Sequence, residues 1–218
     1  MRKLLPITLA ASGLLACSIQ ATTVLNGDFE TGADGFTEWP GYVGGANPAA
    51  IPEWTGLGGH GINPGGLVQA DPTPFDGSST INTSNFAFLQ GTSSISQEIN
   101  GFSVGGEFLV GIDFNARDCC GGLPVATIYI NDAVIGSTTD LLPDPGTVSP
   151  VGGDTPWYHA DVPFTASAET LTLMISSEVI GGDGTLVVDN ISISAIPEPS
   201  SSILALLGAG LLIFRRRR

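Results

Sequence analysis

The sequence predicts an all-β fold, an antiparallel β-sandwich, placed between two apolar terminal segments. Apolar and polar residues alternate repeatedly along residues 22–196, and no stretch of useful length there has the period of an amphipathic helix. Gly, Asn, Asp and Pro separate the alternating runs, as they do at the turns of antiparallel sheets. Several short strands at this spacing are typical of a β-sandwich.

The clearest strand covers residues 108–114, because Phe108, Val110, Ile112 and Phe114 share one face. Further strands are expected at residues 124–130, 133–137, 157–164, 171–175 and 185–194, with a turn at Asn131-Asp132. Residues 101–105 match the pattern G-x-S-x-G, but they lie between two strands. We therefore expect a hairpin turn there and no nucleophile elbow, which needs a strand, a turn and a helix.

Residues 38–84 differ from the rest, since they are rich in Gly and Pro and show no periodicity. A segment of this length inside a compact domain is usually functional or flexible. Its apolar residues are too few and too irregular to form the core of a second domain.

Residues 1–21 have the composition of a signal peptide. Arg2 and Lys3 precede an apolar stretch at residues 4–16, and the sequence Ile19-Gln20-Ala21 suits cleavage after Ala21. The residues before Cys17 also approach a lipobox, which leaves lipidation at Cys17 as an alternative.

The C-terminal segment, residues 197–218, has three parts. Pro197-Glu198-Pro199 comes first, an apolar run at residues 203–214 follows, and Arg215, Arg216, Arg217 and Arg218 close the chain. A helix over that run is about 18 Å long, which is shorter than the ~30 Å hydrocarbon core of a bilayer. The arginines favour a cytoplasmic C-terminus.

This order of parts resembles the PEP-CTERM sorting signal of Gram-negative bacteria. The resemblance implies a transient membrane helix and recognition by an exosortase, followed by release to the cell surface or the extracellular matrix.

The charge of the chain is strongly negative. It contains 21 acidic and 7 basic residues, and Arg117 is the single basic residue between the two ends. Nucleic-acid binding requires cationic side chains against phosphate, so this composition excludes it. An acidic surface attracts Ca²⁺, or it only keeps the protein soluble.

Several short motifs resemble galactose-binding-like jelly-roll domains, which include many carbohydrate-binding modules. These motifs are residues 26–32 for the opening strand, 51–55 for a proline-tryptophan segment, 88–91 and 95–99 for the next two strands, and 188–193 for the last strand. The resemblance spans almost all of the domain at residues 22–196. It implies a structural Ca²⁺ held by Glu30 and Asp189.

Alternation supports the calcium site, because it places Asp189 on one face with Val187, Ile191 and Ile193, where a carboxylate needs compensation. The alternative is a β-bulge near Asp189 that turns the carboxylate outward, and the apolar residues of opposite parity, Leu186 and Val188, favour it.

The remaining candidate residues lie in loops or near their ends. Trp39, Tyr42 and Trp54 are expected to stack on sugar rings, although Trp54 also suits the edge of the core. Arg117, the domain's single arginine, is also expected to contact the ligand, and it lies in the same loop as Cys119 and Cys120. These adjacent thiols suggest a strained disulfide in an oxidising compartment or, alternatively, free or intermolecular thiols.

The first functional hypothesis is a non-catalytic surface or matrix protein that binds extracellular polysaccharide. A purely structural matrix protein is the second. An enzyme acting on polysaccharide is the third, and no cluster of carboxylates on one strand face supports it.

Overall fold

The computed structural model describes residues 22–32, 51–63, 85–117, 121–143, 146–151, 156–179 and 181–197. These residues form eight strands and one four-residue helix, and every strand pairing is antiparallel. The elements are β1 (Thr55–Asn63), β2 (Phe86–Asn100), β3 (Glu107–Ala116), β4 (Pro124–Ile130), β5 (Ala133–Ser137), α1 (Thr138–Leu141), β6 (Tyr158–Thr165), β7 (Thr170–Val179) and β8 (Thr185–Ala195). The prediction of an all-β antiparallel fold is confirmed. No helix in the described ranges is long and apolar enough to cross a membrane.

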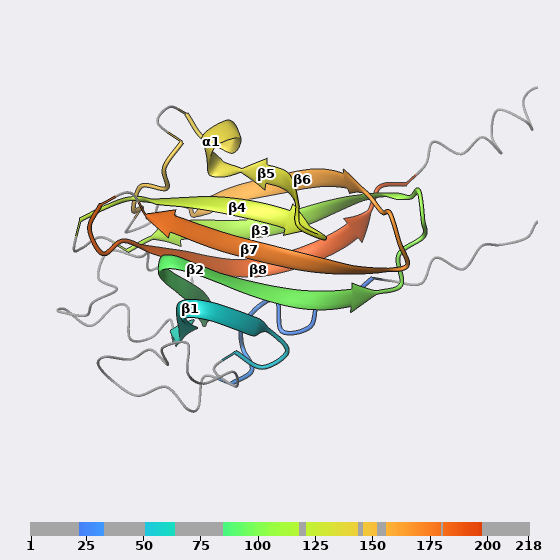
Figure 1. The fold of residues 1–218 in the computed structure, drawn as a ribbon, viewed down its shortest axis with the longest axis horizontal. Helices are drawn as coiled ribbons and strands as arrows, with labels where there is room; N and C mark the ends of the chain where they lie inside the picture. The colour runs from blue at the N-terminus through green and yellow to red at the C-terminus, as the bar shows by residue number, and fades with distance from the viewer. Residues whose placement is uncertain are drawn as a thin grey trace, which may run out of the picture.

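Two layers of strands pack face to face, and the long strand β2 belongs to both (Figure 1). Residues 93–100 of β2 pair with β7, in a layer with the order β5-β4-β7-β2. Residues 87–90 of β2 pair with β8, in a layer with the order β2-β8-β3-β6. Buried residues from both layers form one hydrophobic cluster, so the main core lies between the layers.

The crossing of β2 between layers coincides with an irregular pairing to its other neighbour, β1. The register between these two strands shifts between Leu57 and Gly59. Gly91 of β2 has a φ of 60°, a left-handed conformation that glycine adopts without a steric penalty. A bulge of this kind bends a strand. Strand β2 therefore leaves β8 after Gln90 and joins β7 at Ser93.

The predicted alternation is present in the central strands. Phe108, Val110, Ile112 and Phe114 of β3 are each at most 4% exposed and face the core. Strand β6, beside β3, buries Ala160, Val162 and Phe164 in the core. Strand β7, across the core, buries Leu171, Leu173 and Ile175. The turn between β4 and β5 has positive φ at both central residues, as a two-residue type I′ hairpin requires.

The prediction of a hairpin at residues 101–105 is wrong. Strands β2 and β3 are not neighbours in a layer, and the segment between them crosses from one layer to the other. Phe102 explains why this link is held tightly. It is 3% exposed, and its ring centroid lies 5.0 Å from that of Phe108 and 5.8 Å from that of Phe164. The segment joins two strands without a helix, which agrees with the rejection of a nucleophile elbow.

Three other expectations about local structure are corrected. Residues 88–91 and 95–99 belong to one bent strand, β2, where two strands were expected. Residues 26–32 form turns and bends where the opening strand was expected. Residues 38–84, which show no periodicity in the sequence, contain strand β1. This strand has four glycines, so apolar and polar residues do not alternate along it. The predicted signal peptide and the apolar segment at residues 203–214 lie outside the described residues.

Strand β8 contains a β-bulge at Asp189-Asn190, which was the alternative to an inward-facing Asp189. Its register against β3 shifts after Asp189, and Asn190 has a φ of 51°. The face assigned to Asp189 is therefore corrected: Ile191 and Ile193 point into the main core, while Asp189 lies on the outer face of its layer. The carboxylate is nevertheless only 1% exposed.

Residues 24–29 fill the gap that β2 leaves beside the second half of β8, and we call this strip the N-terminal seam. The Ile191 amide donates to the Gly27 carbonyl at 2.9 Å. A Cβ on Gly27 would lie 2.1 Å from the Ile191 carbonyl oxygen, so this close approach requires glycine. Phe29 then enters the core, fully buried, with its ring centroid 5.9 Å from that of Trp54.

Asn26 fastens the seam to the segment that precedes β1. Its side chain donates to the carbonyls of Thr31 and Pro52 at 3.2 and 3.0 Å, and it accepts from the Thr31 amide at 3.0 Å. Its own carbonyl accepts from the indole nitrogen of Trp54 at 3.1 Å. Asn26 has a φ of 48°, a conformation that asparagine tolerates better than most residues.

We expect Asn26→Ala to destabilise the domain by about 2–4 kcal/mol, because three side-chain hydrogen bonds to the backbone are lost and alanine is strained at positive φ. Thermal unfolding should show a melting temperature lower by about 5–15 °C. Asn100→Ala is the matched control, since this exposed asparagine only accepts from Thr170. Equal melting temperatures for the two variants would contradict the role given to the seam.

Candidate functional site

A depression opens on the outer face of the seam, and we call it the seam depression. It has a volume of about 440 Å³. Its lining consists of Val24, Asn26, Gly27, Asp28, Asn190, Ile191 and Ser192. This volume falls within the range of sites for small ligands, about 300–1,000 Å³. The lining is mostly polar, so the depression suits a ligand that forms hydrogen bonds.

A polar cluster around His159 adjoins the depression across strand β8. His159 Nδ1 lies 2.6 Å from Asp113 Oδ1, and His159 Nε2 lies 3.4 Å from Asp161 Oδ1. The Asn190 side chain donates to Asp113 Oδ2 at 2.9 Å. Because Asn190 also lines the depression, the cluster and the depression form one continuous polar surface, and we call it the outer polar site.

The arrangement follows from the register of β3, β6 and β8. Asp113 pairs directly with His159, and Asp161 lies two residues further along β6, on the same face. Gly111 of β3 leaves room in the middle of the cluster. A Cβ there would lie 2.8 Å from the Ser192 hydroxyl oxygen and 3.4 Å from Asp161 Oδ1.

The two carboxylates favour the charged form of the imidazole. The hydrogen bond to Asp113 raises the pKa of His159 above its ordinary value of 6.5, burial lowers it in part, and the charges of Asp113 and Asp161 raise it further. A raised pKa in the folded state means that protonation stabilises the fold. This contribution is fully present below pH 6.5 and is lost as the pH rises through the raised pKa.

The His159 cluster therefore predicts a pH-dependent difference between the parent protein and His159→Gln. The parent should melt at the higher temperature near pH 6, and the difference should shrink by about pH 9, where the imidazole is neutral. An NMR titration should give a pKa above 6.5 for His159 and a lower pKa in Asp113→Asn. A smaller drop is expected in Asp161→Asn, because Asp113 is the main cause. An unchanged pKa in Asp113→Asn would contradict this assignment.

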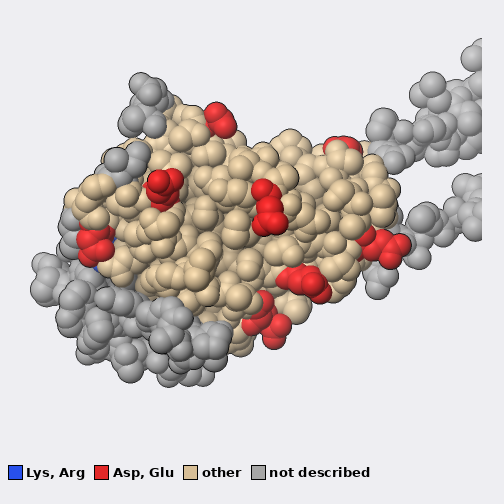
Figure 2. Space-filling view, viewed as in Figure 1, with Lys and Arg blue, Asp and Glu red and all other residues tan. Residues whose placement is uncertain are grey.

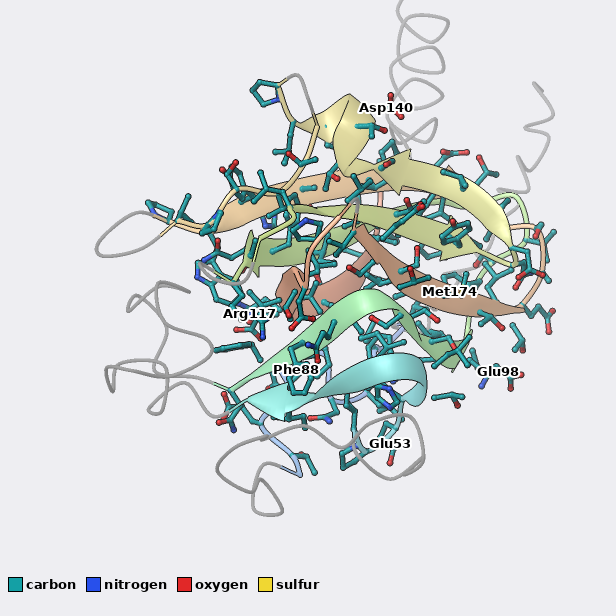
Figure 3. The ribbon with its side chains drawn as sticks, turned by 60° about the vertical axis from the view of Figure 1, so that its left-hand side comes forward. Glu53, Phe88, Glu98, Arg117, Asp140 and Met174 are labelled. Carbon is teal, nitrogen blue, oxygen red and sulfur yellow. The ribbon has the colours of Figure 1, made fainter. Side chains whose placement is uncertain are left out.

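Two of the residues predicted to contact a ligand are internal. Trp54 is 4% exposed and belongs to the core, as the alternative for this residue stated. Arg117 is 6% exposed, and its guanidinium donates to the Asp183 carbonyl and lies 3.3 Å from the Asp183 carboxylate. Figure 3 shows Arg117 at the end of the sandwich opposite to Glu98. The domain's single arginine thus holds a turn in place.

Of the remaining predicted residues, the two calcium ligands are described and most of the others are not. Glu30 is exposed, and both of its carboxylate oxygens accept from Asn85, at 2.9 Å each. Asp189 is buried, and Asp189 Oδ1 accepts from the Asn190 amide at 2.7 Å. No group of three or more His, Cys, Asp or Glu side chains arranged for a metal ion exists among the described residues. The predicted sites at Trp39, Tyr42, Cys119, Cys120, Glu198, Pro199 and Arg215–Arg218 lie outside them.

The surface of the domain is acidic on the face that Figure 2 shows, with carboxylates spread widely and almost no basic side chain. Sequence reasoning did not find the outer polar site, although a signal was present. Asp113, His159 and Asp161 all have outward parity in strands that were predicted correctly. What the sequence did not show is that β3 and β6 are neighbours, which brings these residues together.

Comparison with known proteins identifies the C-terminal segment. Residues 195–218 match the PEP-CTERM protein-sorting motif, which confirms the predicted sorting signal. A motif of this kind indicates an exported, membrane-anchored precursor in a Gram-negative bacterium. No curated protein matches the sequence.

Solved structures with a similar backbone include carbohydrate-binding modules. TmCBM61, solved in complex with beta-1,4-galactotriose, has 13% identity and a TM-score of 0.46, and the match covers 81% of this chain and all of that chain. The CBM22-1–GH10 modules of endo-1,4-beta-D-xylanase 10B from Clostridium thermocellum, complexed with xylohexaose, have 13% identity and a TM-score of 0.45, over 81% of this chain and 29% of that chain. A family 35 carbohydrate-binding module from Clostridium thermocellum has 12% identity and a TM-score of 0.39, over 66% and 92%.

Proposed function

We propose that this protein is exported, processed by an exosortase at its C-terminal motif, and binds extracellular polysaccharide without catalysis. The observation that supports binding most directly is the outer polar site. It combines a depression of about 440 Å³ with carboxylate, amide, hydroxyl and imidazole groups on adjacent strands. Sugars present closely spaced hydroxyl groups, and such donors and acceptors recognise them by hydrogen bonds.

A non-catalytic role fits the state of the carboxylates in this site. Asp113 and Asp161 both contact His159, and Asp113 also accepts from Asn190. Hydrolysis of a glycoside needs two carboxyl groups free to act as an acid and as a base or nucleophile. The contacts in the cluster instead suit a rigid, charged recognition surface.

Polysaccharide binding can be tested with the processed protein on a glycan array. Asp161→Ala should weaken binding to the best glycan by about tenfold, because a carboxylate that accepts from a sugar hydroxyl contributes roughly 1.5–3 kcal/mol. Glu178→Ala is the control, since this exposed carboxylate lies on β7 in the other layer. Equal losses in both variants would place the ligand elsewhere.

A purely structural role in the matrix is the second candidate. It is favoured by the internal positions of Trp54 and Arg117, which remove two of the expected sugar contacts from the surface. If the processed protein binds no glycan on the array, this candidate replaces the first.

Processing at the sorting motif has its own test. The match at residues 195–218 supports it, as do the short apolar run and the terminal arginines. Replacing Pro197, Glu198 and Pro199 by alanine should leave uncut precursor in the inner membrane of a host that has an exosortase. A triple variant that reaches the surface with the same mass loss as the parent would exclude recognition of these three residues.

Calcium binding through Glu30 and Asp189 remains part of the proposal. Asp189 pairs across strands with Asp113, and a bound cation would relieve the repulsion between these carboxylates. The contacts of Glu30 with Asn85 would have to open for it to join the site. Millimolar Ca²⁺ should then raise the melting temperature of the parent and not of Asp189→Asn. Identical melting curves of the parent in calcium and in chelator would contradict calcium binding.

A further inference from the structure

The folded domain continues to the start of the sorting motif, without a spacer. Strand β8 ends at Ala195, and the amide of Ile196 still donates to the Glu107 carbonyl at 2.9 Å. Pro197, the first residue of the motif, follows directly. An enzyme that binds this motif must therefore work next to the sandwich.

The length of the chain limits how far the domain can stand from the membrane. Six residues, 197–202, separate Ile196 from the apolar run. Even fully extended they reach about 20 Å, at roughly 3.3 Å per residue. The headgroup region occupies roughly 5–8 Å of that distance. With the apolar run inserted in the membrane, as the proposed processing requires, the end of the sandwich that carries Ile196 faces the membrane at close range in the precursor.

Three loops form that end, and we call it the motif end. They are the β2–β3 link at residues 101–106, the β4–β5 turn at residues 131–132 and the β6–β7 loop at residues 166–169. Hydrogen bonds join them to one another or to the adjacent start of β7. The Gly101 amide donates to the Glu169 carbonyl, and the Asn131 amide donates to the Thr172 carbonyl, each at 3.0 Å.

The described chain also begins at this end, since both its blue start and its red finish lie at the right of Figure 1. The Leu25 amide donates to the side chain of Gln97 at 2.8 Å, three residues before β2 ends at the motif end. Both junctions with the terminal apolar segments therefore emerge from one side of the sandwich.

The motif end is acidic. Exposed carboxylates surround it, namely Glu98, Glu107, Asp132 and Glu169. Arg117, the single basic residue of the domain, is buried at the opposite end. The surface of an anionic membrane repels such a face, whereas a basic protein surface attracts it.

We propose that the motif end docks on an electropositive extracytoplasmic surface of the enzyme that processes the motif. This inference rests on the proposed processing of residues 197–199 and adds the folded sandwich to what the enzyme recognises. The docked carboxylates keep the chain in place while the motif enters the enzyme.

Charge reversal in the full-length precursor tests the docking surface. The double variant Glu98→Lys, Glu169→Lys places two cations at the motif end, and both native side chains are exposed. In a pulse-chase in the processing host, we expect its precursor to persist at least threefold longer than the parent. The single variant Glu178→Lys is the control, because it lies near the other end of β7, about 20 Å from Glu98 and about 30 Å from Glu169.

A spacer provides the second measurement. Inserting six Gly/Ser residues between Ile196 and Pro197 moves the sandwich away from the enzyme, so the spacer should make the double variant and the parent equal in rate. Equal rates without the spacer would overturn the docking surface, as would equal slowing by Glu178→Lys. Faster cleavage of the double variant would also overturn it and would indicate that the motif end lies against anionic lipid. A parent precursor that is never cut would refute the processing itself, which the other outcomes leave standing.

Discussion

One backbone hydrogen bond, from the Ile191 amide to the Gly27 carbonyl, closes the layer that strand β2 leaves open. β2 must cross from β8 to β7 for the two layers to share a strand, and the crossing exposes the edge of β8. Residues 24–29 fill that edge. The fit requires glycine at position 27, and it carries Phe29 into the core. The order of the core and the closure of the sheet thus depend on the same short segment.

The seam also produces the surface to which we assign a function. The bulge at Asn190 turns its side chain toward Asp113 and leaves the depression between β8 and residues 24–28. A regular strand would place the following residues on the opposite faces. The polar site and the break in the sheet therefore have one cause, and substitutions at the seam affect both stability and recognition.

The strands could be predicted from the sequence because apolar alternation survives wherever a strand faces the core, as in β3, β6 and β7. The connections between strands could not, because periodicity does not show which strands are neighbours. Residues 101–105 were therefore expected to form a hairpin, and the assembly of Asp113, His159 and Asp161 was missed. The sequence suits Trp54 both to a sugar contact and to a place in the core, and the packing of its ring against Phe29 shows that it belongs to the core. Arg117 was expected at a ligand because the sequence does not show that Asp183 lies beside it.

The most direct test of the account is the hydrogen exchange of the Ile191 amide in the native protein. If the seam closes the fold, this amide exchanges only through global unfolding. Its opening free energy should then equal that of amides in the middle of β3 and β7, within about 1 kcal/mol. An opening free energy several kcal/mol lower would show that residues 24–29 detach while the sandwich stays folded, and this would contradict the central place given to the seam.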